Sequence, residues 1–153
     1  MLQLDEFDKK LLRLLQQNNK LTTEELSKKV SLSQSAVQRR ITKLRNERII
    51  EADVSIISPA AVGIGLTCVV DVVLHEGNTK AIELFKKEML KCAEVSLCYY
   101  VTGTYDFVLI VNTQNMNHFE EFQKIKLMEN PYLKHFYTHV VMDKVKAEYS
   151  LSI

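Results

Sequence analysis

The chain has 153 residues, 46% of them hydrophobic and 25% charged, and a net charge of +1, which is ordinary for a globular protein with a buried core. Its length fits one average domain or two small ones. The longest apolar run, residues 68–74, is interrupted by Asp71 and is far too short to cross a bilayer. Because charged residues begin at Asp5, where a signal peptide would be apolar, we expect a cytoplasmic protein without a membrane partner.

The small net charge hides an uneven distribution. Residues 1–58 contain 11 Lys and Arg against 8 Asp and Glu, a net charge of +3, whereas residues 59–153 contain 9 against 11, a net charge of −2. Within residues 28–48 the only acidic residue is Glu47, and the basic residues are Lys28, Lys29, Arg39, Arg40, Lys43, Arg45 and Arg48. A local basic cluster in a near-neutral protein predicts a face that binds a polyanion.

Three short helices are expected in the first fifty residues. The first covers residues 6–18, with Asp5 as its N-cap and apolar residues at helical spacing, namely Phe7, Leu11, Leu14 and Leu15. Thr22 and Glu25 then fit a capping box at the start of a second helix, which buries Leu26 and Val30.

A third helix follows a tight turn and is expected over residues 33–45. Ser33 is its candidate N-cap, and its apolar stripe consists of Val37, Ile41 and Leu44. Two helices joined in this way, with one supporting helix, form a helix-turn-helix, which places its second helix in the DNA major groove.

The polar residues of the third helix lie wholly or partly off its apolar stripe. Those near its N-terminal end can bond base edges, and we expect them to read sequence: Ser33, Gln34, Ser35 and Gln38. The cations are expected to contact phosphates and to set the salt dependence: Arg39, Arg40 and Lys43. The alternative is that a charged, exposed helix is merely solvated. Arg45 and Arg48, nearer the next segment, are either phosphate contacts or simple surface charge.

A strand and a linker are expected after the third helix. Residues 49–57 are rich in Ile and Val and predict a short strand, which would make the helix-turn-helix a winged one. Residues 58–65 contain Pro59, Gly63 and Gly65 and lie where the sign of the charge changes. We therefore expect a DNA-binding domain over residues 1–57, a linker over 58–65 and a second domain over 66–153.

The second domain alternates strands and helices in the order βαββαβ. Strands are expected over residues 66–75, 95–102, 107–112 and 135–147, and helices over residues 79–91 and 115–128. The inward-facing helix residues would be Ile82, Phe85, Met89, Phe119, Phe122, Ile125 and Met128. This order is the ferredoxin-like arrangement, so the fold class is α+β. Two helices cover only one face of such a sheet, and we expect a second subunit to cover the other face.

Several features argue against an enzyme or a metal protein. Cys68, Cys92 and Cys98 are odd in number and form no Cys-x-x-Cys pair, so we interpret them as free thiols. His135 and His139 are four residues apart, but in a strand and without other ligands at metal-binding spacing. The chain has no phosphate-binding glycine motif and no nucleophile beside a base, and we expect no cofactor, no metal and no catalysis.

These elements, with a Thr-Gly-x-x-Asp turn in the hairpin between the second and third strands of the second domain, resemble the Lrp/AsnC family, the feast/famine transcription regulators. The similar segments are residues 4–44, the hairpin TGTYDFVLIV and the closing stretch VVMDKVKAEYSLSI. The resemblance implies binding to double-stranded DNA near promoters, homodimers that assemble into tetramers or octamers, and response to a small effector, usually an amino acid. Two positions depart from the family, which tends to have glycine where this chain has Ser31 and Arg48. An Arg48 held at positive φ would cost about 1 kcal/mol relative to glycine.

The turn is the candidate effector site, made of Thr102, Gly103, Thr104, Tyr105 and Asp106. Gly103 allows the backbone to approach a ligand closely, its neighbouring N–H groups suit a carboxylate, and Asp106 suits an ammonium. The alternative is an ordinary polar turn whose Asp106 bonds its own backbone. Candidates for side-chain selectivity are Tyr100, Tyr105, Met116 and Thr138.

The sequence therefore predicts a sequence-specific DNA-binding transcriptional regulator whose assembly or operator affinity responds to an amino acid. The alternative is an architectural DNA-compacting protein of the same fold without a working effector pocket. A small metabolic ferredoxin-like module would not explain the first 50 residues.

Overall fold

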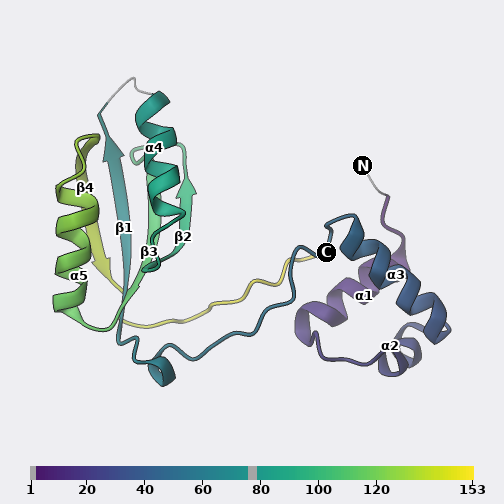
Figure 1. The fold of residues 1–153 in the computed structure, drawn as a ribbon. Coiled ribbons are helices and arrows are strands. Elements are labelled where there is room, and N and C mark those ends of the chain that lie inside the picture. The colour runs from purple at the N-terminus through teal and green to yellow at the C-terminus, as the bar shows by residue number, and fades with distance from the viewer. Residues whose placement is uncertain (1–2, 76–78) are drawn as a thin grey trace. The chain divides into compact units, whose positions relative to one another are not determined.

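The computed structural model describes residues 3–75 and 79–153. The chain divides into two compact units, one formed by residues up to Ile56 together with Lys146–Ile153, and one formed by Ile57–Val145 (Figure 1). The final residues, which we expected to belong to the second domain, are thus grouped with the first unit. No helix in the described ranges is long and apolar enough to cross a membrane.

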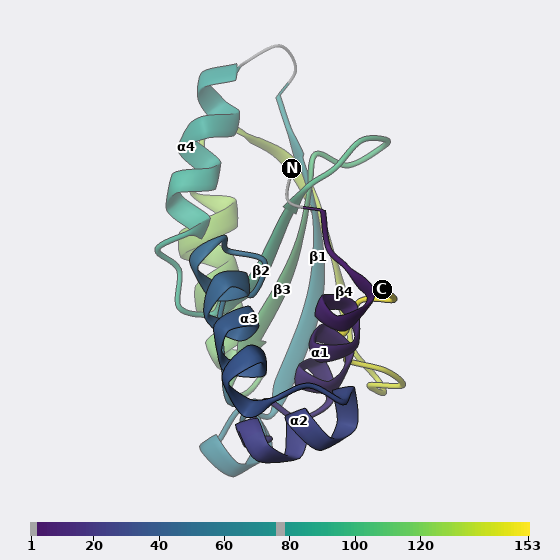
Figure 2. The ribbon, with the colours of Figure 1, turned by 90° about the vertical axis from the view of Figure 1, so that its right-hand side faces the viewer.

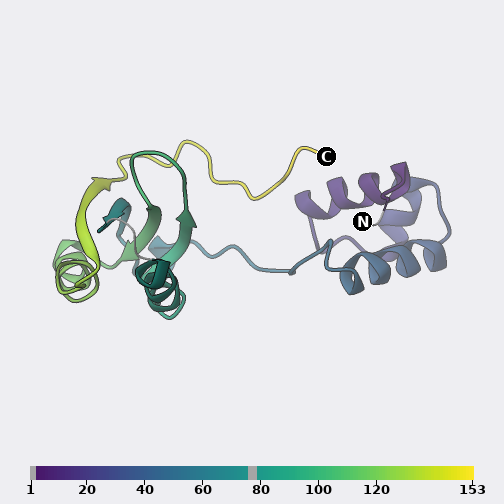
Figure 3. The same cartoon turned by 90° about the horizontal axis from the view of Figure 1, so that it is seen from above.

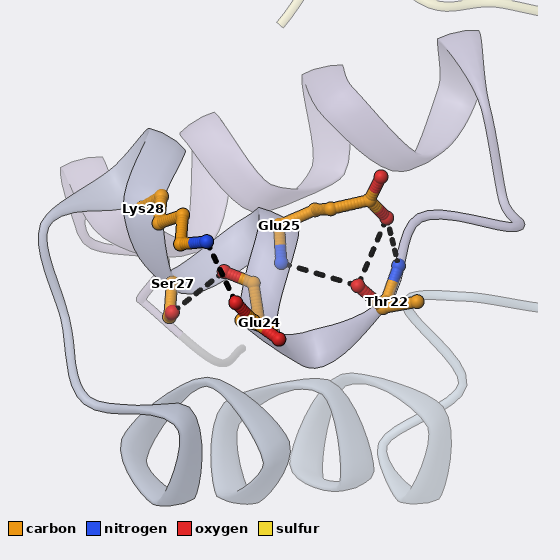
Figure 4. Close-up of polar contacts among 5 residues, drawn as sticks. All are labelled: Thr22, Glu24, Glu25, Ser27 and Lys28. Atoms are coloured by element: carbon orange, nitrogen blue, oxygen red, sulfur yellow. Dashed lines mark hydrogen bonds and ion pairs between the residues drawn. The ribbon is translucent and has the colours of Figure 1, made fainter.

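The first unit consists of three helices, α1 (Glu6–Gln17), α2 (Thr23–Val30) and α3 (Gln34–Asn46) (Figure 2). Each begins at the expected N-cap, whose side chain accepts a backbone hydrogen bond: Asp5, Thr22 and Ser33. The capping box predicted at α2 is complete (Figure 4). The Thr22 N–H donates to Glu25 Oε2 at 2.7 Å, and the Glu25 N–H donates to Thr22 Oγ1 at 3.2 Å.

The core of this unit is formed by the apolar stripes predicted from the sequence. Leu11 of α1 packs with residues of the other two helices, namely Leu26, Val30, Val37 and Ile41. Leu44, the last member of the α3 stripe, is also buried. Because the three stripes meet in one cluster, the opposite side of each helix is left to solvent.

Ser31 and Arg48, the two departures from glycine, both have positive φ, at 57° and 54°. Each lies just after a helix, and the residue that follows closes the end in the same way. The Leu32 N–H donates to the Ser27 carbonyl, and the Ile49 N–H donates to the Leu44 carbonyl, a pattern of helix ends that favours glycine.

Ser31→Gly is therefore expected to raise the free energy of unfolding of the first unit. The gain is about 0.5–1 kcal/mol, because glycine relieves the left-handed strain but costs more entropy on folding. Chemical denaturation of wild type and variant measures it. Ser31→Ala, which keeps the Cβ atom, is the matched control and should give no gain; equal stability of the glycine and alanine variants would contradict the prediction.

The strand predicted over residues 49–57 is wrong. This segment has no strand in the structure, and its apolar side chains are exposed, Val54 at 68% and Ile56 at 80%. The β-branched residues suit a strand, but no described segment pairs with them, and an unpaired strand is not stable. The described part of the first unit therefore has no wing.

The second unit contains a four-stranded antiparallel sheet in the order β2-β3-β1-β4. Its strands are β1 (Leu66–Leu74), β2 (Val95–Tyr100), β3 (Phe107–Thr113) and β4 (Leu133–Val140), and its helices are α4 (Thr79–Met89) and α5 (Met116–Phe122). Both helices lie on the same side of the sheet (Figure 3). The short 3-10 turn η1 (Ala60–Val62) precedes β1. The βαββαβ prediction is confirmed.

The core of the second unit lies between the sheet and these two helices. Alternate residues of β1 and β3 point into it and are buried, and Phe85 of α4 contacts Phe107 of β3, with ring centroids 4.7 Å apart. The intervening residues lie on the other face, where Val69, Val73, Val108 and Ile110 are only half-buried. Apolar side chains therefore line a sheet face that neither α4 nor α5 covers.

The helix predicted over residues 115–128 does not stay α-helical to its end. After Phe122 the chain continues as a π-helix, η2 (Gln123–Met128). The wider turn changes which side chains face the core: Leu127 is buried, whereas Ile125 and Met128, predicted to face inward, are 49% and 63% exposed.

The closing strand ends earlier than predicted, at Val140 instead of residue 147. The tail beyond it has no regular structure, and its last residues form hydrogen bonds with side chains of α1. The Gln16 side-chain amide both donates to the Leu151 carbonyl, at 3.1 Å, and accepts from the Leu151 N–H, at 2.6 Å. These bonds attach the tail to the first unit.

Candidate DNA interface and effector loop

The candidate DNA interface is the exposed side of α3. Val37, Ile41 and Leu44 turn into the core and fix how the helix lies on the other two. Six of the seven predicted DNA-binding residues are exposed: Ser33, Gln34, Ser35, Gln38, Arg39 and Lys43. The structure therefore brings polar and cationic side chains together on one accessible helix.

At the start of α3, the Ser33 side chain forms hydrogen bonds with the Ser35 side chain and with the helix backbone. Ser33 Oγ accepts from the Ala36 N–H at 3.2 Å and lies 3.1 Å from Ser35 Oγ. Ser33 is thus a helix cap as well as a candidate for reading DNA. The hydroxyl groups of Ser33 and Ser35 both lie at the N-terminal end of α3. In helix-turn-helix proteins, residues at this end of the second helix contact the base edges.

Gln38 is held by two threonines. Thr23 Oγ1, at the start of α2, donates to Gln38 Oε1 at 3.3 Å, and Gln38 Nε2 donates to Thr42 Oγ1 at 3.3 Å. Thr42 is exposed on α3, and sequence reasoning missed it. Its place one turn after Gln38 and beside Lys43 was the available signal.

Arg40, which was predicted to contact a phosphate, is held in two ion pairs in this structure. Its Nη1 donates to Asp5 Oδ2 and to Asp8 Oδ1, both at 2.7 Å, and its guanidinium lies over the Phe7 ring at 5.5 Å. The hydrogen bonds to Asp8 and Asp5 raise the pKa of Arg40, and the Asp8 backbone N–H is the main cause of a lowered pKa of Asp5. Arg40 joins α3 to the start of α1, and its charge is already balanced.

Arg39 and Lys43 behave differently from Arg40. Within the described residues neither forms an ion pair, so their charges are available to phosphates. Arg45 is paired, since its Nη2 lies 3.0 Å from Asp53 Oδ2. The sequence left the roles of Arg45 and Arg48 open. In this structure Arg45 belongs to a surface ion pair, and Arg48 is exposed just after α3.

The candidate effector loop, Thr102–Asp106, joins β2 to β3. Thr102, Gly103 and Thr104 are exposed. Gly103 has φ of 115°, and a Cβ atom there would meet nothing within 4 Å. The backbone at this point is therefore open to a ligand, and its conformation suits glycine.

Asp106 anchors the loop to β1. Its Oδ2 accepts from the Leu74 N–H at 2.7 Å, and its own N–H donates to the Val72 carbonyl at 2.9 Å. The partner of the carboxylate is thus a neighbouring strand and not the turn's own backbone. The second oxygen, Oδ1, accepts no hydrogen bond from the described residues, and it remains available to an ammonium group.

The four candidates for side-chain selectivity do not gather in one place. The Tyr105 ring packs on Tyr137 of β4, with centroids 5.8 Å apart, and Tyr100 packs on Phe107 at 5.1 Å. Thr138 lies opposite Val70 in the middle of β1, and Met116 begins α5 beyond the far end of β3. Within one chain only Tyr105 belongs to the loop.

The metal-binding residue types and the cysteines of the described chain were also considered as candidate sites in the sequence. No group of three or more His, Cys, Asp or Glu among the described residues could hold a metal ion. The three cysteines are free thiols, as predicted, and Cys68 and Cys92 are buried. Burial, together with a hydrogen bond to Glu94, raises the pKa of Cys92 to about 11, which keeps this thiol protonated and unreactive at neutral pH.

Comparison with known proteins gives matches over both units. The AsnC-type helix-turn-helix domain family matches residues 4–45, and the Lrp/AsnC ligand binding domain family matches residues 67–151. An HTH-type transcriptional regulator, y4tD, of Sinorhizobium fredii is 46% identical over 152 residues, which are 99% of this chain and 90% of that protein. The transcriptional regulator AzlB of Bacillus subtilis is 33% identical over 150 residues, or 98% and 96% of the two chains.

A solved structure is similar over nearly the whole chain. It is a transcriptional regulator of Neisseria meningitidis in complex with L-methionine, with a TM-score of 0.92 and 31% identity, covering 98% of this chain and 97% of that one.

Proposed function

This chain belongs to the Lrp/AsnC family of transcriptional regulators and has an effector-binding domain, and we propose that it binds operator DNA through α3 and responds to an amino acid at the Thr102–Asp106 loop. The observation that carries the proposal is the exposed side of α3. It combines short hydrogen-bonding side chains at the helix N-terminus with two cations, Arg39 and Lys43, that form no ion pair with any residue the structure describes. The first kind suits base edges and the second suits phosphates.

The assembled unit on DNA is proposed to be a homodimer, which can build larger even-numbered assemblies. The apolar sheet face opposite α4 and α5 supports it, because a surface of this kind is typical of a subunit interface. A symmetric dimer would place its two α3 helices in successive major grooves, about 34 Å apart.

The effector is proposed to be an amino acid. Free amino acids carry a carboxylate and an ammonium, and the loop offers open backbone at Gly103 for the first and Asp106 Oδ1 for the second. The Neisseria relative supports L-methionine as the first compound to test. Binding that prefers one assembly would change operator affinity by linkage, typically by ~1–3 kcal/mol.

The test is equilibrium binding of the full chain to DNA selected from a random library, with and without each of the twenty amino acids. We expect the selection to enrich one DNA sequence, and at least one amino acid to change the affinity of the protein for that sequence. Tight binding with little sequence preference and no response to any amino acid would favour an architectural DNA-compacting protein. No binding to duplex DNA would end the proposal.

Asp106→Asn is expected to weaken binding of the amino acid that this screen identifies. The amide keeps an oxygen for the Leu74 N–H but removes the negative charge from the ammonium site. Loss of a hydrogen bond between charged groups predicts roughly tenfold to hundredfold weaker binding by calorimetry. Asp143→Asn, at an exposed tail residue, is the control of equal charge change. Equal affinities of the Asp106 and Asp143 variants would place the ammonium elsewhere.

A further inference from the structure

We propose that Thr23 and Thr42 are positioning residues for Gln38, holding its side-chain amide in the orientation in which it reads a base edge. The inference rests on the proposed function, because it requires α3 to lie in the major groove. Residue Thr23 belongs to α2, which is not the helix proposed to contact the bases. The inference therefore makes a residue of α2 a determinant of DNA sequence preference.

The geometry engages both ends of the Gln38 amide. Its oxygen accepts from Thr23 Oγ1 and its nitrogen donates to Thr42 Oγ1, each at 3.3 Å. Thr23 is half-buried at the first position of α2, whereas Gln38 and Thr42 are exposed on α3. One contact therefore comes from a neighbouring helix and the other from the next turn of the same helix, so the amide is fixed relative to both.

This orientation matters because the two ends of an amide are chemically different. A glutamine that recognises adenine accepts from the base N6 amino group with its oxygen and donates to N7 with its nitrogen. A free glutamine must lose its side-chain rotational freedom to do so. A glutamine already held at both ends loses less, and its preference for one base over another is correspondingly sharper.

Gln34 provides an internal comparison. It is also a glutamine exposed on α3, four residues earlier, but its side chain forms no hydrogen bond within the described residues. Removing the Thr23 hydroxyl should therefore change the base preference due to Gln38 and leave any preference due to Gln34 unchanged.

The experiment measures affinities of full-chain variants for the selected duplex and for its single-base variants. Gln38→Ala first identifies the base pair that Gln38 reads, where discrimination should fall by about fivefold or more. Thr23→Val, which keeps the shape but removes the hydroxyl, should lower discrimination at that same base pair by about twofold to tenfold. Thr23→Ser, which restores the hydroxyl, should recover it. Thermal unfolding confirms that each variant is folded.

A double-mutant cycle separates positioning from direct contact. If Thr23 acts through Gln38, Thr23→Val has no further effect on discrimination in the Gln38→Ala protein. Equal weakening for all sequences would instead make Thr23 a phosphate contact and overturn the inference. Unchanged discrimination in Thr23→Val, with discrimination lost in Gln38→Ala, would overturn the inference and leave the proposed function standing. Unchanged discrimination in Gln38→Ala would refute both the reading role of Gln38 and the inference.

Discussion

Replacing Arg39 and Lys43 together by alanine is expected to lower the affinity for duplex DNA by about 60-fold at 0.1 M salt. Each cation that neutralises a phosphate contributes about 0.9 to the slope of log K against log salt, so the slope should flatten by about two. The loss should be similar for the selected sequence and for unrelated DNA, because phosphates carry no sequence information. Fluorescence anisotropy over a salt series measures both quantities.

The matched control is Lys80→Ala with Lys87→Ala. Both residues are exposed on α4 in the second unit, so the double variant makes the same change in net charge away from the proposed interface. Its salt slope should equal that of the wild type. An unchanged slope in the Arg39 and Lys43 variant would show that α3 is not the face that meets the phosphates.

Leu11→Ala is expected to destabilise the first unit by about 3 kcal/mol, through lost burial and the cavity left behind. Leu11 is 0% exposed and packs with residues of both α2 and α3. A three-helix unit of this size has little stability in reserve, so DNA binding should fall sharply while the second unit stays folded. Hydrogen exchange, resolved by residue, measures the two units separately.

Leu90→Ala is the control for the leucine substitution. Leu90 is 85% exposed, and its loss should change stability by no more than about 0.5 kcal/mol. Equal exchange rates in the α2 and α3 amides of wild type and Leu11→Ala would contradict the packing that we describe for the first unit.

Features set by neighbours in sequence were predictable. The caps at Asp5, Thr22 and Ser33 need only a side chain and a backbone N–H three residues later. The core stripes of the three helices follow from helical spacing, and the strands of the sheet follow from their β-branched residues. Local pattern was therefore enough for the three helices of the first unit and for the order of strands and helices in the second.

Two conformations did not follow from the spacing of apolar residues. Helical spacing placed Ile125 and Met128 inward, but the π-helix η2 exposes both and buries Leu127 instead. The strand expected over residues 49–57 has β-branched residues, but a strand also needs a partner, and helical or strand spacing says nothing about partners. In both segments the spacing identified which residues are apolar or β-branched, but it did not determine the backbone conformation that they adopt.

The candidate sites show the same division. The exposed side of α3 was predicted because its apolar stripe was evident. The pairing of Arg40 with Asp5 and Asp8, and of Gln38 with Thr23, joins separate helices, and the anchoring of Asp106 by Leu74 joins a loop to a strand. Such contacts appear only once the helices and strands are packed.

Methylation protection of the selected operator by dimethyl sulfate tests most directly whether α3 enters the major groove. The reagent methylates guanine N7 in the major groove and adenine N3 in the minor groove, where these atoms are exposed. We predict protected guanines in two clusters one helical turn apart, about 10 base pairs, with protection lost in the Arg39 and Lys43 variant. Entry of α3 into the major groove would be contradicted if the guanine N7 atoms were as reactive in the complex as in free DNA. It would also be contradicted if protection were confined to adenine N3.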